Sequence, residues 1–316
     1  MEQGVFVGEK FIKMGIVAHI GDNLESHTVG GFSACFSSKD ICRACHLQHH
    51  ELPSITGIPM APRWTQDEYD QAVRNHLERQ PNDRTPSEFG VSRSCVFNEL
   101  ESFKSVGQFP FDSMHDFLEK IAAFDIQAGL LTLVAQRKFT LEEYNELLKN
   151  VQLKDYEVGD RPPPVKPHTD RLQGKALAVS LHIRLLTGFL YRLLNEDEDS
   201  IVLDLLLIIH ELHEYVMADA LSAGDLLTFE ELAVKYFAKR KECIDKFPAF
   251  HKLTPRFHFL EHYAEQMERY GPFTGVWSAR CESKHREYVN FSESSKNFIN
   301  ILKTLAEKDR KKMACR

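Results

Sequence analysis

The 316-residue sequence has no long uninterrupted apolar run. Its most apolar stretch, residues 201–209, is interrupted by Asp204 and is far shorter than the ~20 residues that a membrane-spanning helix needs. The first residues also lack a basic segment followed by an apolar segment and a small-residue cleavage site. We therefore expect no membrane segment and no secretion, which leaves the nucleus or the cytoplasm.

Excess positive charge is absent too, because 46 acidic residues outnumber 39 lysines and arginines and give a net charge of −7. This balance argues against a generally basic nucleic-acid binder, although a local basic groove remains compatible with it. The cysteines are odd in number, seven, and two of them form Cys42-x-x-Cys45. Such usage favours thiols that bind metal in a reducing compartment over disulfides.

Helical spacing of apolar residues dominates what is present, and the 43% apolar content suffices for a buried core. Thr140, with Glu143 at the capping-box position, marks one helix start. Residues 14–21 are an exception, because a β-branched run ending at a glycine predicts a buried strand. Residues 52–108 are broken by prolines and predict a connecting arm with Trp64 as a packing anchor. The predicted helices are 66–78, 112–135, 140–150, 175–194, 201–220, 228–247, 258–270 and 296–308.

Two histidines, His258 and His262, are spaced one helical turn apart, so both imidazoles can reach one metal ion. Cys42 and Cys45 can chelate zinc through a tight turn, and zinc prefers four tetrahedral sulfur or nitrogen ligands. Local candidates for the remaining ligands are Cys35, His49 and His50, and distant candidates are His258 and His262. The alternative is a pair of free cysteines in a loop.

Acidic residues give a second set of candidates. Asp22 follows the predicted strand and could hold a divalent cation, or it could cap a helix that starts near Leu24. Asp112, His115 and Asp116 could bind a metal, but a helix cap with a solvated face explains them as well. His210 and His213 lie among leucines at core spacing, which favours a satisfied core or boundary pair.

Glu282 stands in a basic context that suits an acid working beside phosphate, formed by Arg280, Lys284, His285 and Arg286. The residues 308–312 are also basic, and such a tail suits contact with phosphates or with solvent.

Taken in order, these motifs resemble transposon-encoded DDE transposases of the cut-and-paste superfamilies, over nearly the whole chain. These enzymes have a ribonuclease-H-like core interrupted by a helical insertion. The motifs that carry the resemblance are Gly21-Asp22-Asn23, Cys42-x-x-Cys45, Asp112-x-x-His115-Asp116, His258-x-x-x-His262, Tyr270-Gly271-Pro272, Trp277 and Glu282-Ser283-Lys284-His285.

The resemblance implies a mainly α fold, with a large all-helical insertion domain on a partial, incomplete ribonuclease-H-like α/β core. Residues 1–51 would be the partial core with the CxxC motif, and residues 52–250 the helical insertion. Residues 251–316 would return to the core with the histidine pair, the Glu282 helix and the basic tail.

The resemblance also implies site residues. Asp22 and Glu282 would be the second and third catalytic acids, while the first has no match in this sequence. The structural zinc ligands would be Cys42, Cys45, His258 and His262. The residues placed to contact DNA would be Trp277, Arg280, Lys284, His285 and Arg286.

The missing acid bears on the reaction. Phosphodiester cleavage by this type of site uses two divalent ions held by three carboxylates, so we expect magnesium or manganese to bind properly only if the triad is completed. We therefore expect a transposase-derived remnant that is not a competent nuclease alone. Its expected partners are DNA, a related transposase subunit or a second copy of the chain.

Two other functional classes fit parts of the sequence. His258-x-x-Glu261-His262 matches the inverted zinc metalloprotease pattern, in which Glu261 would be the general base. A helical interaction protein with structural zinc and no DNA role fits the same fold. It differs from the transposase remnant in whether Asp22 and Glu282 converge.

Overall fold

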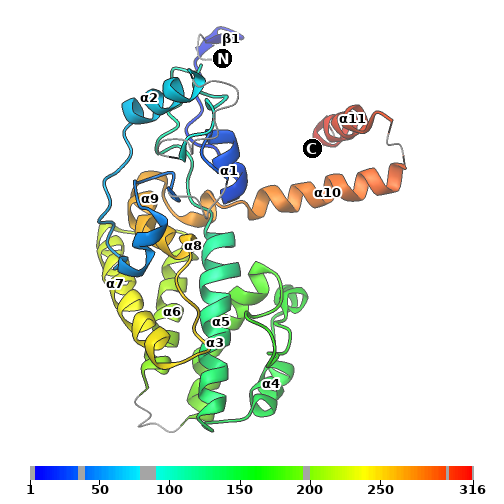
Figure 1. Cartoon of the computed structure of the whole chain (residues 1–316). Coiled ribbons are helices and arrows are strands. Elements are labelled where there is room, and N and C mark those ends of the chain that lie inside the picture. The colour runs from blue at the N-terminus through cyan, green and yellow to red at the C-terminus, as the bar shows by residue number, and fades with distance from the viewer. Residues whose placement is uncertain (1–3, 35–39, 79–89, 195–199, 297–298, 315–316) are drawn as a thin grey trace.

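The structure is a computed structural model that describes residues 4–34, 40–78, 90–194, 200–296 and 299–314 (Figure 1). Most of these residues are helical, and the only sheet among them is a two-stranded antiparallel hairpin. The N-terminal elements are β1 (Val5–Val7), β2 (Lys10–Ile12), α1 (Asn23–Gly30), η1 (His49–Ser54) and α2 (Gln66–Leu77). The middle elements are η3 (Met114–Ala122), α3 (Ala123–Ala135), α4 (Leu141–Asn150), η4 (Asp155–Asp160), α5 (Ala176–Leu193), α6 (Ile201–Val216) and α7 (Ala223–Lys246). The C-terminal elements are α8 (Pro255–Phe259), η5 (Leu260–His262), α9 (Tyr263–Tyr270), η6 (Phe273–Gly275), α10 (Ala279–Ser295) and α11 (Ile301–Ala314).

The predicted mainly helical fold is therefore confirmed, and the caps explain where several helices start. The Thr140 hydroxyl accepts a hydrogen bond from the Glu143 amide, and the Glu143 carboxylate accepts one from the Thr140 amide, as predicted. Thr65 with Glu68 and Ser222 with Asp225 form the same reciprocal pair at the starts of α2 and α7. The polar residues 292–295 form the last turn of α10.

The strand predicted over residues 14–21 is wrong, because this segment has no β partner. Its polar backbone groups are satisfied by side chains of another loop. The Gln108 amide donates to the carbonyls of Ile16 and Val17 at 3.2 and 2.8 Å, and Ser102 Oγ accepts from the Ile16 amide at 3.2 Å. A β-branched run favours extended backbone, but it forms a strand only where a second strand is available.

One region of the predicted helix 112–135 is a π-helix rather than an α-helix. The wider turn covers Met114–Ala122, and α3 then continues in the normal geometry. π-helices are rare in proteins overall. Those that occur are often found at functional sites.

The buried apolar side chains form two clusters. The main core runs through η3, α3, α5, α6 and α7 and includes Cys42 and Cys45. A smaller N-terminal core gathers aromatic residues of α2 and the neighbouring loops. Trp64 is 4% exposed in that core and donates to the Cys42 carbonyl at 3.3 Å, so it packs as predicted.

Helix α5 is the one helix in the described parts of the chain that is long and apolar enough to cross a membrane by length and composition. It packs against η3 and α6, and 56% of its apolar window is buried inside the protein. This degree of burial is typical of a helix in the core of a protein.

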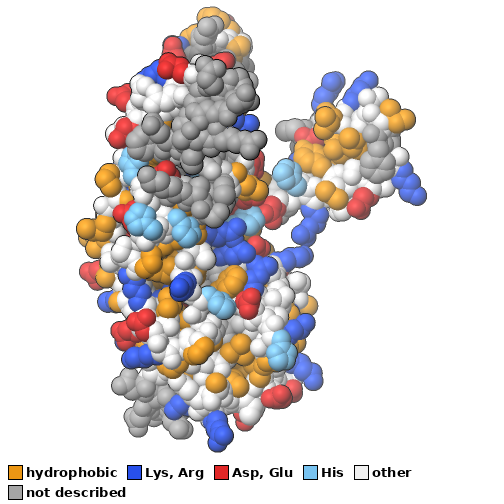
Figure 2. Space-filling model, in the orientation of Figure 1, with side chains coloured by type: hydrophobic (Ala, Val, Ile, Leu, Met, Phe, Trp, Pro, Cys, Tyr) orange, Lys and Arg blue, Asp and Glu red, His pale blue; other side chains and the backbone are white. Residues whose placement is uncertain are grey.

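Helix α10 leaves the helical body as an arm, and α11 lies at its far end (Figure 1). The two helices are joined by ion pairs, since Lys284 Nζ lies 2.6 Å from Asp309 and Lys312 pairs with Glu287. The arm stands clear of the body on the face drawn in Figure 2. The division into residues 1–51, 52–250 and 251–316 stays a prediction.

Candidate metal centre

The two cysteines lie in a loop that a neighbouring segment holds in place. Cys45 forms an isolated β-bridge with Arg63, and the Trp64 amide donates to the Ala44 carbonyl at 3.2 Å. Within the loop, the Ala44 amide donates to Cys42 Sγ at 3.3 Å. An amide directed at the thiol sulfur favours its deprotonated form. The loop is thereby preset to present both sulfurs on one side.

The two histidines come from a short helical segment near the other end of the chain. Pro255 opens α8 at a position where its missing amide costs nothing, and His258 follows on the same short helix. The next turn, η5, tightens to 3-10 geometry and ends at His262. Their rings remain on one face, with 3.1 Å between the two Nε2 atoms.

Four donor atoms meet where these segments touch. Cys42 Sγ lies 3.5 Å from His262 Nε2, and Cys45 Sγ lies 3.1 Å from His258 Nε2. All four donor atoms lie within 4.8 Å of one another. Zinc–sulfur bonds of about 2.3 Å and zinc–nitrogen bonds of about 2.0 Å at tetrahedral angles would separate such atoms by about 3.3 to 3.8 Å. The donor set and its spacing are therefore compatible with one zinc ion.

Glu261 orients one of the two histidines, His258. Its Oε2 lies 2.9 Å from His258 Nδ1, which leaves Nε2 of the same ring directed at the sulfurs. Its other oxygen accepts the amides of Thr56 and Gly57, both at 2.9 Å. A carboxylate that holds the second nitrogen of a ligating histidine is the usual outer partner at zinc sites.

Burial makes this cluster costly without a metal. Cys45, His258 and His262 are at most 1% exposed. Burial raises the pKa of the Cys42 thiol, but the hydrogen bond from Cys45 and the charges of His262 and His258 hold it well below its usual range. Burial lowers the pKa of His258, yet the Cys42 thiolate and Glu261 raise it to about 9. Zinc binds deprotonated cysteine and neutral histidine, so metal binding would displace the protons that these groups hold.

Arg43, inside the CxxC motif, is a buried charge that sequence reasoning missed. It donates to the carbonyls of Phe109 and Pro110 and to Asn23 Oδ1, at 2.8 to 2.9 Å. Its guanidinium lies 3.9 Å from the centre of the Phe111 ring. Phe111 in turn stacks on His262, with ring centroids 5.4 Å apart. A basic residue between two zinc-type cysteines was the only available signal.

Asp22 caps α1, as the alternative prediction had it. Its carboxylate accepts from the Glu25 amide at 2.8 Å, and its backbone has the extended conformation of a cap residue. The next residue, Asn23, donates to Asp116 Oδ1 at 2.5 Å. Asp116 is fully buried, and burial, followed by the nearby charge of Asp112, raises its pKa to about 8.

Glu282 lies on the exposed first turn of α10, where its Oε1 is 3.0 Å from His115 Nε2. His115 Nδ1 lies 2.6 Å from the buried carboxylate of Asp112, which also accepts from Ser278. Burial lowers the pKa of His115, but Asp112, Glu119 and Glu282 raise it to about 9. The imidazolium thus joins two carboxylates and fixes the root of α10 to η3. Asp112 and His115 serve here as ion-pair partners rather than as a solvated face.

The residues predicted to contact DNA fall into two groups. Arg280, His285 and Arg286 are exposed on α10. Lys284 is paired with Asp309, and Trp277 is half-buried against the main core. The arm therefore presents three exposed basic or imidazole side chains of the five.

The remaining histidine and cysteine candidates lie elsewhere. His49 and His50 are exposed on η1, outside the four-donor cluster, and Cys35 lies outside the described residues. His213 Nε2 is 2.8 Å from Ser180 Oγ, and His210 Nδ1 is 3.1 Å from the Ile183 carbonyl, so each ring has one hydrogen-bond partner, as expected of core or boundary residues. Among the described residues, five cysteines are free thiols: Cys42, Cys45, Cys95, Cys243 and Cys281.

Comparison of the chain with family models, curated proteins and solved structures returned no match.

Proposed function

We propose that the chain is a transposase-derived DNA-binding protein that is held together by one structural zinc ion and does not cut DNA alone. The observation that carries the proposal is the convergence of four soft donor atoms within 4.8 Å, contributed by segments 213 and 220 residues apart in sequence. This is the ligand order and spacing that the resemblance to DDE transposases implies. Bound zinc would supply a cross-link between the CxxC loop and the α8–η5 segment.

A structural role for the metal follows from the donor set. Two cysteines and two histidines fill all four tetrahedral positions, whereas a catalytic zinc keeps one position for water. Glu261, the base of the metalloprotease alternative, already binds His258 and two backbone amides. This arrangement supports a closed zinc site over a peptidase.

The two candidate acids support binding rather than cleavage. Asp22 is engaged as the cap of α1, and Glu282 is engaged with His115. A site for two divalent ions needs carboxylate oxygens that are free to bind them. Magnesium or manganese would be bound properly only if a further acid completed the set.

Exposed basic groups on the α10 arm are the proposed DNA contact. Arg280, His285 and Arg286 face solvent on a helix that projects from the body (Figure 1). Phosphate contacts by arginine release counterions, so such binding weakens steeply with salt.

The test is a binding and nicking assay on generic duplex DNA with zinc-loaded protein and manganese. We expect a salt-dependent complex, no cleavage, and weaker binding for Arg280→Gln with Arg286→Gln. Arg192→Gln, on α5, is the matched control that keeps binding unchanged. Cleavage that Glu282→Gln abolishes would overturn the non-catalytic proposal, and equal binding by the double variant would overturn the arm as the contact.

A second candidate is a helical interaction protein without a DNA role. The observation that favours it is the apolar surface of the arm, where Val289, Ile299 and Leu302 are 52%, 92% and 80% exposed. Exposed apolar groups that gather on one element mark protein contacts. A concentration-dependent dimer that Leu302→Glu dissociates, together with no DNA complex, would favour this candidate.

A further inference from the structure

A cavity of about 340 Å³ lies apart from the metal centre, between the start of α3, the end of α7 and the loop that leads into α8. Ligand sites typically have volumes of about 300 to 1,000 Å³, so this cavity has room for a small molecule. Figure 2 shows lysine and arginine side chains gathered on the middle of the body, over the region where η3 and α8 lie.

The lining of this cavity has an excess of positive charge. The cavity is lined by four cationic side chains and one carboxylate, Asp125. The cations are Lys120, Arg240, Lys252 and Arg256. Four positive charges less one negative charge leave three in excess. Asp125 is moreover already in use, because it accepts from Arg240 Nε at 2.8 Å and from the Tyr236 hydroxyl at 2.5 Å.

The other three cations form no close ion pair among the described residues, although the charge of Glu119 acts on Lys120 and that of Asp116 on Arg256. The side chains of Lys120, Lys252 and Arg256 form no ion pair and no hydrogen bond in that part of the chain. The pKa of Lys120 is lowered, first by burial and then by the charges of Arg256 and Arg171. Cations that repel one another at a partly buried surface favour a bound anion, which would relieve both costs.

Aromatic side chains form part of the same cavity wall. The Phe257 ring lies under the Arg240 guanidinium at 3.9 Å, and the Phe124 ring lies 5.6 Å from Lys120 Nζ. Both rings line the cavity together with Ala128 and Pro255. Flat apolar surface beside unpaired cations suits a ligand with a planar ring and an anionic group.

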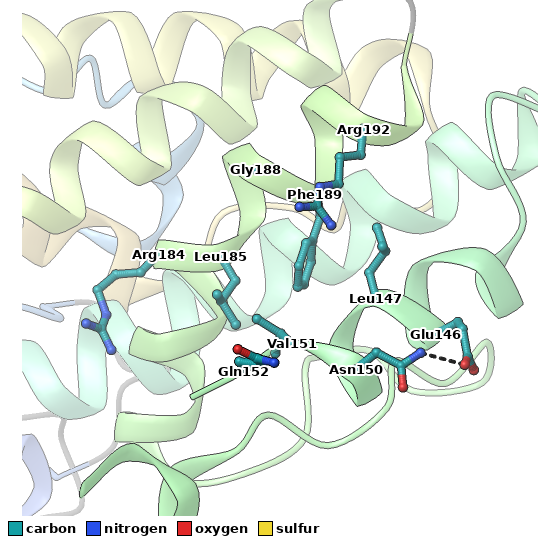
Figure 3. A pocket seen from close by; sticks show the side chains of 10 residues that line it. All are labelled: Glu146, Leu147, Asn150, Val151, Gln152, Arg184, Leu185, Gly188, Phe189 and Arg192. Carbon is teal, nitrogen blue, oxygen red and sulfur yellow. Dashed lines mark hydrogen bonds between the residues drawn. The ribbon is translucent and has the colours of Figure 1, made fainter. Parts of the chain in front are cut away.

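The groove between α4 and α5 provides a contrast (Figure 3). It also has two arginines, Arg184 and Arg192, but they lie at opposite ends of an apolar floor that includes Leu185 and Phe189. Arg184 is already paired with Glu157 at 2.6 Å. Charges do not converge there, so the same chemistry is not available.

We propose that the cavity between α3, α7 and α8 binds a small aromatic phosphomonoester, of the chemical class of a mononucleotide. The phosphate would lie among Lys120, Lys252 and Arg256, and the ring would lie against Phe124. The site requires neither zinc chemistry nor transposase descent, so its failure would leave the proposed function intact.

The test is calorimetric titration of the zinc-loaded full chain with AMP, adenosine and inorganic phosphate at low salt. We expect AMP to bind with one-to-one stoichiometry and adenosine and phosphate to bind at least about tenfold more weakly, because each offers half of the contacts. Lys120→Met and Arg256→Met should each weaken AMP binding about tenfold or more, while Lys120→Arg retains it. Arg192→Met should change the affinity by less than about twofold.

Circular dichroism and zinc content show whether each variant keeps the wild-type fold. Lys120→Arg changes the side chain but keeps its positive charge, so retained AMP binding in this variant shows that the charge is what matters. Absence of AMP binding up to about 5 mM would overturn the proposal, since that is weaker than a specific small-ligand site. Equal AMP affinity in Lys120→Met and Arg256→Met would overturn it as well. A duplex DNA complex that AMP does not compete with, and that the same two variants weaken, would assign these cations to DNA instead.

Discussion

The helical body and the metal centre bury different kinds of side chain. In the body, Leu205, Leu206, Ile209 and Leu212 on α6 are fully buried against neighbouring helices. At the metal centre the buried groups include Arg43, Asp116, His258 and His262, each at most 3% exposed. Each fully buried leucine or isoleucine contributes about 1.5 to 3 kcal/mol, whereas buried charges and imidazoles contribute only when they are paired. The body can therefore fold by apolar burial, while the metal centre depends on its ligand and its hydrogen bonds.

Removal of zinc should have the largest effect, and it should act on one region. We expect a strong chelator to expose the amides of residues 40–55 and 255–263 to hydrogen exchange while α5 and α6 stay protected. The reason is that a structural zinc ion contributes many kcal/mol to the segments that it joins, about 10 or more in isolated zinc domains. Uniform loss of protection across α5 and α6 would show that the two regions are not separable.

Breaking the buried ion pair of the body should have the next largest effect. Arg240→Met leaves the Asp125 carboxylate buried at 1% exposure with only the Tyr236 hydroxyl as partner. The expected loss of stability is about 3 to 5 kcal/mol by urea unfolding. Asp125→Asn with Arg240→Met removes both charges and should recover part of that loss, and zinc content should stay unchanged in both variants. A loss below about 1 kcal/mol for the single variant would contradict the buried pair.

Acid should weaken the body through His182. This ring is buried, lies 2.7 Å from the Tyr144 hydroxyl, and has its pKa lowered by burial from 6.5 to about 4. The unfolded chain therefore binds more protons between these values. The free energy of unfolding therefore has its full value, as far as His182 is concerned, above pH 6.5. It falls as the pH drops toward 4, by about 3 kcal/mol in total.

His182→Gln keeps a partner for the Tyr144 hydroxyl but does not titrate. The variant should show a flatter fall of stability between pH 7 and pH 4 than the wild type, in urea unfolding at equal zinc loading. Zinc loss in acid is common to both proteins and cancels in the comparison. Parallel pH profiles would contradict the assignment to His182.

The smallest effect should come from the outer partner of the metal centre. Glu261→Gln retains the shape of the side chain but weakens its bond to His258 Nδ1. We expect about a 10- to 100-fold loss of zinc affinity in competition with a chelator, with all four ligands still in place. Glu268→Gln, an exposed acid further along α9, is the matched control and should bind zinc as the wild type does. Equal affinity in both variants would show that Glu261 does not orient the ligand.

The structural features that can be predicted from the sequence are those that depend on local residue patterns. The spacing of leucines in α6 and the Thr140–Glu143 pair identify helices and their starts without reference to the rest of the chain. The four metal donors are among the candidates that a CxxC turn and two histidines one helical turn apart provide, and the resemblance to DDE transposases selects them over Cys35, His49 and His50. The position of His213 among leucines predicts a core residue, and the side chain is 1% exposed.

The parts that the sequence does not predict depend on distant partners. Residues 14–21 look like a strand, but the wider protein supplies Gln108 and Ser102 instead of a second strand. Asp125 and Arg240 are separated by 115 residues and each resembles a solvated helix charge until α3 and α7 meet. The π-helix at Met114–Ala122 has no known local sequence signal of this kind, and with it the contact of His115 with Glu282 stays hidden.

Zinc K-edge X-ray absorption on the purified chain, combined with metal analysis, tests the central claim most directly. The account predicts one zinc per chain with two sulfur ligands at about 2.3 Å and two nitrogen ligands at about 2.0 Å. It also predicts that Cys45→Ser replaces one sulfur and that His49→Ala with His50→Ala changes nothing. A first shell of nitrogen and oxygen only, or a spectrum altered by the His49 and His50 substitutions, would contradict it.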